Sequence, residues 1–359
     1  MTYSLPVPGA IMTDSKSKGF SSKSFSSKSF VSARMVAERA GVSRSAVSRT
    51  FTDGASVSEA TRRKVLDAAG ALGYHVNHLA RGLRERSNIV CLVVSDITTP
   101  IRAGMVDALS RKLQADGKVI MIINTGTDTE SVSAALRQTL NYRADATVVL
   151  SGTPSATLIE TCRANGQQLV LINRDERLSG SLNLGVDNGL AGREAFFLLR
   201  RAGCARLAVV GSTARTASLV EREQAFCAAA EAEGMAVTVT QAGPTSYASG
   251  FEAGRQLFAG SRAPDGVFCV TDLLALGFMD AVRHEFRLRV PGDVCVVGFD
   301  DIEQAGWDSY QLTTFAQPLD AMAAHVVHLL HEPDAAGPEP FVFAPIPRWR
   351  RSVRPAPPE

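Results

Sequence analysis

The chain has 359 residues, of which 45% are hydrophobic and 21% charged, as expected for a soluble protein of two or three domains. No stretch reaches the ~18 apolar residues that a membrane span needs, and the N-terminus lacks the apolar core of a secretory signal. We therefore expect a cytoplasmic protein. The net charge of +2 is uneven, because the first 86 residues carry +8 and the remainder −6. This asymmetry predicts a polyanionic partner at one end of the chain.

The cysteines are scattered and none belongs to a CxxC pair. Three of them lie inside apolar, strand-like runs. This pattern predicts reduced, buried thiols in a reducing compartment. The six are Cys91, Cys162, Cys204, Cys227, Cys269 and Cys295.

Residues 1–31 include SKSKGFSSKSFSSKSF, a near-repeat of Ser, Lys and Phe without helical or strand periodicity. We expect a disordered basic tail. Such a tail either adds nonspecific attraction to phosphate or has no role.

Residues 32–76 predict an all-α headpiece of three short helices. Ser32, Ser43 and Ser58 are placed to cap the three helix N-termini. Gly41 separates the first helix from the second, and Gly73 follows the third, where a helix C-cap belongs.

The second helix of the headpiece, residues 43–50, is predicted to have two different faces. At 100° per residue, Arg44, Ser45, Ser48 and Arg49 fall on one side, and the other side is small and mostly apolar. A helix that enters the major groove of DNA has this division, since Arg can bond to guanine O6 and N7 together. The helical wheel alone leaves a solvated helix pair as an equal alternative.

Residues 77–87 are short, basic and only mildly apolar, and we interpret them as a hinge. From residue 88 to 350 apolar runs alternate with helix-like stretches, which predicts parallel sheets covered by helices on both faces and divided between two α/β lobes. The predicted strands are 89–94, 119–123, 146–150, 169–172, 182–186, 206–210, 236–240, 266–270 and 294–299. The clearest predicted helices are 101–115, 129–142, 188–202, 218–234 and 272–286.

Two stretches of the headpiece and hinge, VAERAGVSRSAVSRTF and VSEATRRKVLDAAGALGYHVNHLARGL, resemble the lactose-repressor (LacI) family of bacterial transcriptional regulators. The resemblance continues through the core and covers residues 34–352. Its core segments are SDITTP (95–100), GVDNGLAG (185–192), TDLLALG (271–277), PGDVCVVGFDD (291–301) and LTTFAQP (312–318).

This resemblance implies a periplasmic-binding-protein-like core that binds a small effector between its lobes. The N-lobe is expected to comprise about 88–186 plus 315–340, and the C-lobe about 188–312 plus 341–350. Residues 351–359 are expected to be a loose tail. The resemblance also implies a homodimer, or a dimer of dimers, on a near-palindromic double-stranded operator.

The resemblance implies DNA-binding roles residue by residue. Base edges are expected to be read by Arg44, Ser45 and Arg49, and phosphates to be contacted by Ser43, Ser48 and Thr61. Asn77 opens the hinge helix, and Leu83 with Ala80 beside it is expected to wedge into the minor groove. Gly82 lies inside the hinge helix, where glycine is a poor helix former and departs from the family pattern. This predicts a hinge that is helical only on DNA.

For the effector, the resemblance points first to Arg222 and Asp272. Strand-end residues are weaker candidates, for which loop capping is equally expected: Asp96, Asn124, Asn173, Arg174 and Asp187. Arg102 either adds charge to the site or is solvated.

Ile101-Arg102 and Thr245 stand where many family members have aromatic residues that stack on a sugar. We therefore expect a sugar acid, an open-chain polyol derivative or a phosphorylated sugar rather than a neutral pyranose. Phe251, Trp307 or Tyr310 would restore an aromatic wall if they face the site.

Two other functions are disfavoured by the sequence. A transporter's solute-binding protein would share the core, but would need a signal peptide and no basic headpiece. An α/β enzyme is disfavoured because GxSxG, Walker A and GxGxxG motifs are absent. His325, His328 and His331 have a spacing that could bind a metal but is more typical of a surface helix face. We expect no catalytic residue, metal or cofactor.

Overall fold

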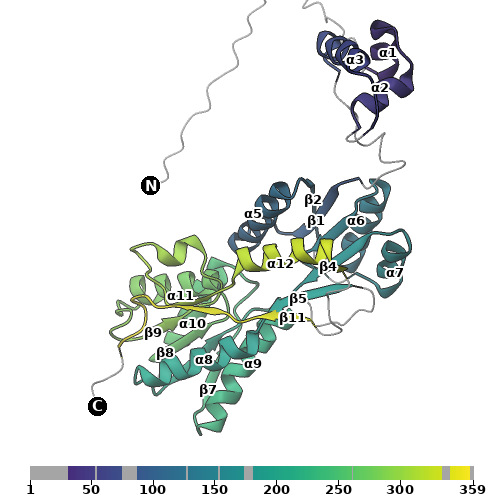
Figure 1. The fold of residues 1–359 in the computed structure, drawn as a ribbon. Helices are drawn as coiled ribbons and strands as arrows, with labels where there is room; N and C mark the ends of the chain where they lie inside the picture. The colour runs from purple at the N-terminus through teal and green to yellow at the C-terminus, as the bar shows by residue number, and fades with distance from the viewer. Residues whose placement is uncertain are drawn as a thin grey trace, which may run out of the picture. The chain divides into compact units, whose positions relative to one another are not determined.

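The computed structural model describes residues 31–52, 55–74, 87–126, 128–152, 154–173, 181–260, 262–333 and 340–355 (Figure 1). The chain divides into two units, residues 1–78 and 79–359. Within the described ranges, no helix combines the length and hydrophobicity that crossing a bilayer requires.

The headpiece consists of three helices, each begun by a serine whose hydroxyl accepts a backbone N–H. The caps Ser32, Ser43 and Ser58 accept from Met35, Ala46 and Thr61, which confirms the three predicted N-caps. Gly41 and Gly73 end two of the helices with positive φ angles of 64° and 66°. The helices are α1 (Ala33–Ala40), α2 (Arg44–Thr50) and α3 (Glu59–Leu72).

The headpiece has a small core of its own. Val36, Val47 and Val65, one from each helix, are buried against one another with neighbouring alanines. The Arg62 guanidinium donates to the Thr50 carbonyl oxygen at 2.9 Å, so α3 also holds the end of α2. Packing against α1 and α3 therefore fixes the position of α2 within the headpiece, with its polar face exposed.

The first lobe is a six-stranded, all-parallel sheet in the order β11-β5-β4-β3-β1-β2. All seven residues of β1 are buried, which explains its continuous apolar sequence. The strands are β1 (Ile89–Ser95), β2 (Val119–Thr125), β3 (Ala146–Val149), β4 (Gln168–Ile172), β5 (Leu182–Val186) and β11 (Phe341–Phe343). The helices are α5 (Pro100–Ala115), α6 (Thr129–Asn141), α7 (Ala156–Ala164) and α12 (Leu319–His331).

The second lobe has a four-stranded parallel sheet in the order β7-β6-β8-β9. Its strands are β6 (Leu207–Val210), β7 (Val237–Thr240), β8 (Gly266–Cys269) and β9 (Cys295–Val297). Its helices are α8 (Asn188–Arg201), α9 (Ala217–Ala232), α10 (Tyr247–Phe258) and α11 (Asp272–His284), followed by the short 3-10 helix η1 (Glu303–Gly306). This lobe and the first confirm the predicted fold class.

The chain passes between the lobes more than once. β10 (Thr314–Ala316) pairs antiparallel with β12 (Ile346–Arg348), which makes a two-stranded ribbon separate from both sheets. After β10 the chain enters α12, which packs against α5 of the first lobe (Figure 1).

The structure differs from the predicted lobe boundaries at the C-terminal end. Phe341–Phe343, assigned to the C-lobe from the sequence, pair in parallel with β5 and extend the N-lobe sheet. The Phe341 ring also stacks on His325 of α12, with 4.1 Å between ring centroids. This short edge strand follows a Pro-rich stretch, and three residues carry too little periodicity to reveal its partner.

Residues 351–355 also differ from the predicted loose tail. The Ser352 hydroxyl donates to the Val296 carbonyl oxygen at 2.6 Å and accepts from the Thr313 N–H at 2.7 Å. Ser352 is therefore buried in the second lobe. These contacts join residues far apart in the chain, so local sequence patterns could not predict them.

Candidate DNA-binding and effector sites

The exposed face of α2 carries every polar residue that the helical wheel placed there. Ala46, Val47 and Thr50 are buried on the opposite side. The exposed residues are Ser43, Arg44, Ser45, Ser48 and Arg49. The predicted division of this helix into two faces is confirmed.

The side chains on the exposed face of α2 differ in the hydrogen bonds that they make within the headpiece. The Ser43 hydroxyl caps the helix and lies 2.8 Å from the Ser45 hydroxyl. Arg49 Nε donates weakly to the Ser45 carbonyl oxygen at 3.4 Å. No described residue pairs with the Arg44 guanidinium, so all of its donors remain available to a partner.

Thr61 lies in the first turn of α3, half-buried, with its hydroxyl 2.8 Å from that of Ser58. The hinge residues Asn77, Ala80 and Leu83 lie outside the described residues, as does Arg174 of the effector set. Their assigned roles stay predictions.

A cavity of about 850 Å³ opens between the two lobes of the core. Asp96 and Asn173 reach it from the ends of β1 and β4, and Thr271 and Asp300 reach it from just beyond β8 and β9. The carboxyl ends of parallel strands are where α/β sheets bind ligands, so this position agrees with the general rule.

Arg222 of α9 lines this cavity although only 4% of it is exposed. Nε donates to Asn188 Oδ1 at 2.8 Å, Nη1 donates to the Val270 carbonyl oxygen at 2.9 Å, and the guanidinium lies 3.5 Å from the Phe299 ring centroid. No described residue accepts from Nη2. Burial lowers the pKa of Arg222 to about 10, which leaves it charged at neutral pH.

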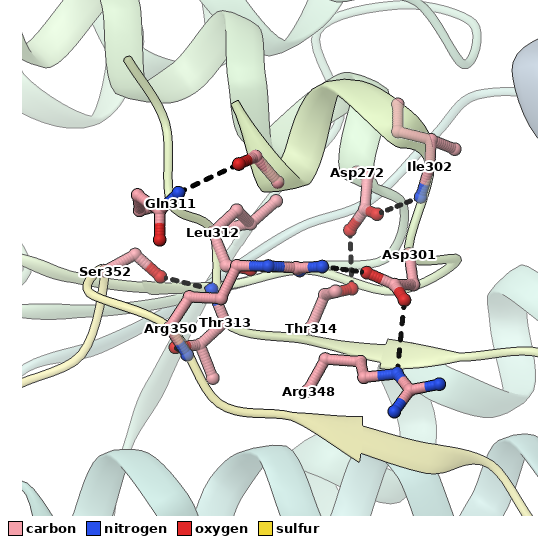
Figure 2. Close-up of polar contacts among 11 residues, drawn as sticks. Asp272, Asp301, Ile302, Gln311, Leu312, Thr313, Thr314, Arg348, Arg350 and Ser352 are labelled. Atoms are coloured by element: carbon pink, nitrogen blue, oxygen red, sulfur yellow. Dashed lines mark hydrogen bonds and ion pairs between the residues drawn. The ribbon is translucent and has the colours of Figure 1, made fainter. Parts of the chain in front are cut away.

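Asp272 is not in the cavity wall, contrary to the expectation that it contacts the effector. It is fully buried, and both carboxylate oxygens are already used (Figure 2). Oδ2 accepts from the Ile302 N–H at 3.0 Å, and Oδ1 accepts from the Thr314 hydroxyl at 2.6 Å. Burial, with the nearby Asp300 carboxylate, raises the pKa of Asp272 to about 7.

Asp300 is the acidic residue of the second lobe that does line the cavity, and our sequence analysis did not single it out. It is 7% exposed and accepts from Gln317 Nε2 at 2.8 Å. Burial raises its pKa to about 6. The signal was available, because Asp300 directly follows the apolar run VCVVGF, as Asp96 follows β1.

Two buried polar atoms at the cavity have no hydrogen-bond partner among the described residues, Asn173 Oδ1 and Thr271 Oγ1. Buried polar atoms are nearly always satisfied, so these two are available to a ligand. They come from different lobes, so one bound molecule could engage both sides of the cavity.

Arg102 and Asp96 form a second polar group in the cavity. Arg102 Nη1 donates to the Ser95 carbonyl oxygen at 2.8 Å and lies 3.5 Å from Asp96 Oδ2. Hydrogen bonds from the hydroxyls of Thr99 and Thr98, together with the Arg102 charge, lower the pKa of Asp96. One end of the cavity therefore holds a fixed, partly exposed ion pair.

The remaining two strand-end candidates do not reach the cavity. Asn124 is exposed on β2, the outermost strand of the first sheet. Asp187 caps α8, with Oδ1 accepting from the Leu190 N–H at 2.7 Å. For both, the loop-capping or surface alternative fits the structure better than ligand contact.

None of the described residues that line the cavity is aromatic, and Ile101 and Thr245 are part of its wall. Phe251, Trp307 and Tyr310 are absent from it. The Tyr310 hydroxyl instead donates to Asp280 at 2.8 Å, and Trp307 is half exposed on the surface.

The end of β12 and the residues just after it are tied to the loop beside the cavity (Figure 2). Arg350 Nη2 lies 2.6 Å and Arg348 Nε 3.3 Å from the Asp301 carboxylate. Asp301 adjoins Asp300, so these ion pairs link Arg348 and Arg350 to the cavity wall.

Two of the three histidines of α12 are neighbours, with the ring centroids of His325 and His328 6.0 Å apart. His325 stacks on Phe341, and His331 lies 2.8 Å from Asp116 Oδ1. Among the residues with described positions, no three candidate ligands gather in a way that would hold a metal ion.

Two family models match separate parts of the chain. Residues 34–77 match the model for bacterial regulatory proteins of the lacI family, and residues 198–353 match the periplasmic binding protein-like domain. The chain is 32% identical over 291 residues to the HTH-type transcriptional regulator CelR of Thermobifida fusca, with 76% of this chain and 83% of that protein covered. It is 28% identical over 279 residues to the ribose operon repressor of Escherichia coli K12, covering 76% of this chain and 84% of that protein.

Among solved structures, the lac repressor dimer bound to operator and an anti-inducer superposes with a TM-score of 0.81. It is 21% identical, and the match covers 90% of this chain and 99% of that chain. A likeness at this identity shows the fold. Taken with the headpiece model and the CelR match, it establishes that the chain belongs to the LacI family of bacterial transcriptional regulators.

Proposed function

We propose that the protein is an operator-binding repressor, acting as a homodimer, whose DNA affinity is set by a small hydroxylated molecule bound between the lobes. The observation that carries the proposal is the presence in one chain of two surfaces. One is the exposed Arg and Ser face of α2, and the other is a polar cavity lined by both lobes. The named relatives are regulators or repressors, and we propose no catalytic reaction.

The mechanism follows from linkage between two binding equilibria. A ligand that bonds to Asn173 in one lobe and to Thr271 or Asp300 in the other favours one relative position of the lobes. If the two core conformations differ in operator affinity, the ligand shifts that affinity by its own differential affinity for them.

The cavity favours an anionic, hydroxylated effector, such as a sugar acid, an open-chain polyol derivative or a phosphorylated sugar. Arg222 Nη2 has no acceptor among the described residues, and a charge-assisted bond to an anion is stronger than a neutral one. Asp300 and Asn173 offer acceptors for hydroxyl groups. The cavity wall described here offers no aromatic platform for a pyranose.

Titration calorimetry of the full chain against neutral pyranoses, polyols, sugar acids and sugar phosphates tests this proposal. We expect the tightest binding from an anionic member, and a weakening of at least tenfold in Arg102→Ala. The matched control is Arg111→Ala, which removes an exposed arginine of the same helix outside the cavity. Tight binding of a neutral pyranose that is unchanged in Arg102→Ala would contradict the anionic effector.

A further inference from the structure

Cys204 and Cys295 lie near each other in the second lobe, where Arg354 contacts both sulfur atoms. Cys204 follows the turn that ends α8, and Cys295 is the first residue of β9. Gly266 of β8 pairs in register with Cys295. A Cβ at Gly266 would lie 2.7 Å from Cys204 Cβ and 2.9 Å from its sulfur, so the missing side chain leaves room for the Cys204 thiol beside Cys295.

Arg354 contacts both sulfur atoms. Its Nη2 donates to Cys204 Sγ at 3.4 Å, and its backbone N–H donates to Cys295 Sγ at 3.3 Å. Its Nη1 is held by the carbonyl oxygens of Pro291 and Gly292, at 2.9 and 3.2 Å. One cation and one backbone donor therefore face a buried pair of thiols.

These surroundings separate Cys295 from the other cysteines, including Cys204, whose pKa is raised. The hydrogen bond with Cys204, the Arg354 N–H and the Arg354 charge lower the pKa of Cys295 to about 7, whereas burial raises the pKa of Cys91 to about 12. Burial also raises the pKa of Cys162 and Cys269. A thiolate is the reactive form of cysteine, so Cys295 is the most nucleophilic of these thiols at neutral pH.

We propose that Cys204 and Cys295 are a peroxide-reactive dithiol that oxidises to an intrachain disulfide beneath the C-terminal segment 350–355. The Cys295 thiolate attacks one peroxide oxygen, the O–O bond breaks, and the departing hydroxide takes a proton to form water. The Cys204 thiol, whose pKa is raised by its hydrogen bond with Cys295 and by burial, attacks the sulfur of the resulting sulfenic acid. The S–S bond forms, the S–O bond breaks, and the departing hydroxide takes the Cys204 proton and leaves as a second water. In total, two thiols and one hydrogen peroxide give one disulfide and two waters.

Disulfide formation changes the hydrogen bonds that Arg354 makes to the two sulfur atoms. A disulfide carries no negative charge, so the bonds from the Arg354 guanidinium and N–H to sulfur weaken. The same segment includes Ser352, buried against β9, and Arg350, paired with Asp301. We therefore expect oxidation to loosen residues 350–355. This inference does not depend on the identity of the effector or of the operator.

Thiol counting on the reduced full chain provides the test. After stoichiometric hydrogen peroxide and alkylation in denaturant, we expect two of the six thiols to be lost, and peptide mass spectrometry to find Cys204 linked to Cys295. Cys162→Ser is the matched control, because it removes a buried cysteine without an arginine on its sulfur, and it should still form the disulfide. Six free thiols in the treated wild type, or a link between another pair, would overturn the proposal.

Two single variants assign the roles of the two thiols. Cys204→Ser should leave a sulfenic acid at Cys295 that dimedone traps, and Cys295→Ser should give neither dimedone adduct nor disulfide. Hydrogen exchange of the amides of 350–355 should accelerate on oxidation in the wild type and stay unchanged in Cys295→Ser, which does not react. Wild-type mapping remains decisive if either variant fails to fold. Equal peroxide reactivity at Cys162 and Cys295 would refute the role of Arg354.

Discussion

Substitution of Arg49 tests whether this residue reads base edges or contacts a phosphate. Its side chain is exposed on α2 and held only by a weak bond to the Ser45 carbonyl oxygen. We predict that Arg49→Ala costs about 1–3 kcal/mol of operator affinity and relaxes preference at particular base pairs. Binding of the variant to an operator library with single base-pair changes measures both effects.

Arg34→Ala is the control for this prediction, since Arg34 is an exposed arginine of α1 paired with Glu38. It should change affinity for all library members alike. A uniform loss in Arg49→Ala would make Arg49 a phosphate contact instead of a base reader.

The buried Asp272 carboxyl predicts a particular pH dependence of stability. Its folded pKa of about 7 exceeds the unfolded value of 3.8, because burial and the Asp300 charge disfavour ionisation. Below pH 3.8 both states are protonated. Between about pH 4 and 7 the folded state binds the extra proton, so the contribution of this group to stability falls as pH rises, by at most about 1.4 kcal/mol per pH unit.

Asp272→Asn removes this proton and should flatten the decline. An asparagine oxygen can still accept from the Ile302 N–H while its amide donates to Thr314, so the variant keeps the local bonds. Urea unfolding at pH 4 to 7.5 gives the difference from wild type. Parallel wild-type and variant curves would mean that Asp272 is ionised throughout this range.

Asp272 and Asp300 show where residue-level prediction from sequence stops. Both follow buried strands of the second lobe, but only Asp272 was predicted from the sequence to contact the effector. Only the three-dimensional packing shows that Ile302 and Thr314, 30 and 42 residues away, use both oxygens of Asp272 and leave Asp300 facing the cavity. Ligand contact depends on such long-range partners, which strand periodicity does not encode.

At the level of elements, local signals predicted most of the fold. Serine caps, glycine C-caps and fully apolar runs identified the headpiece helices and the parallel strands, because these features act within a few residues. The failures are β11 and the segment around Ser352. Each is short, and each is fixed by contacts with strands far away in the sequence, β5 for the first and β9 for the second.

The hinge offers a test at the same scale, on residues outside those the structure describes. Gly82 costs a helix about 1 kcal/mol relative to alanine, so Gly82→Ala should raise operator affinity about fivefold by favouring the helical hinge. Binding isotherms on operator and on unrelated DNA, with and without effector, measure the change. Gly70→Ala in α3, where an added Cβ meets no atom within 4 Å, is the control that stabilises a helix without touching the hinge. Unchanged or weaker binding in Gly82→Ala would show that the glycine is needed for close approach to DNA.

At the scale of the whole molecule, the ribbon of β10 and β12, with Arg350 just after it, connects chain segments of the two lobes to the cavity wall. β10 and β12 pair with each other in a ribbon separate from both sheets, and Arg348 and Arg350 bind Asp301 next to the cavity residue Asp300. A change in the relative position of the lobes must therefore act on this ribbon and on the cavity wall together.

The final prediction separates the two binding functions. Arg222→Ala should abolish the response to effector and keep operator binding, because Arg222 lies in the core and its partners Asn188, Val270 and Phe299 all belong to the core. Because the change also leaves Asn188 and Val270 without a donor, Asn173→Ala provides a milder second variant with a partly exposed side chain. Operator titrations with and without effector give the coupling factor, and calorimetry of the effector with and without operator must return the same factor in wild type. If operator affinity falls in both variants without effector, the cavity residues set the DNA-binding conformation itself. If both variants keep a full effector response, the effector binds elsewhere.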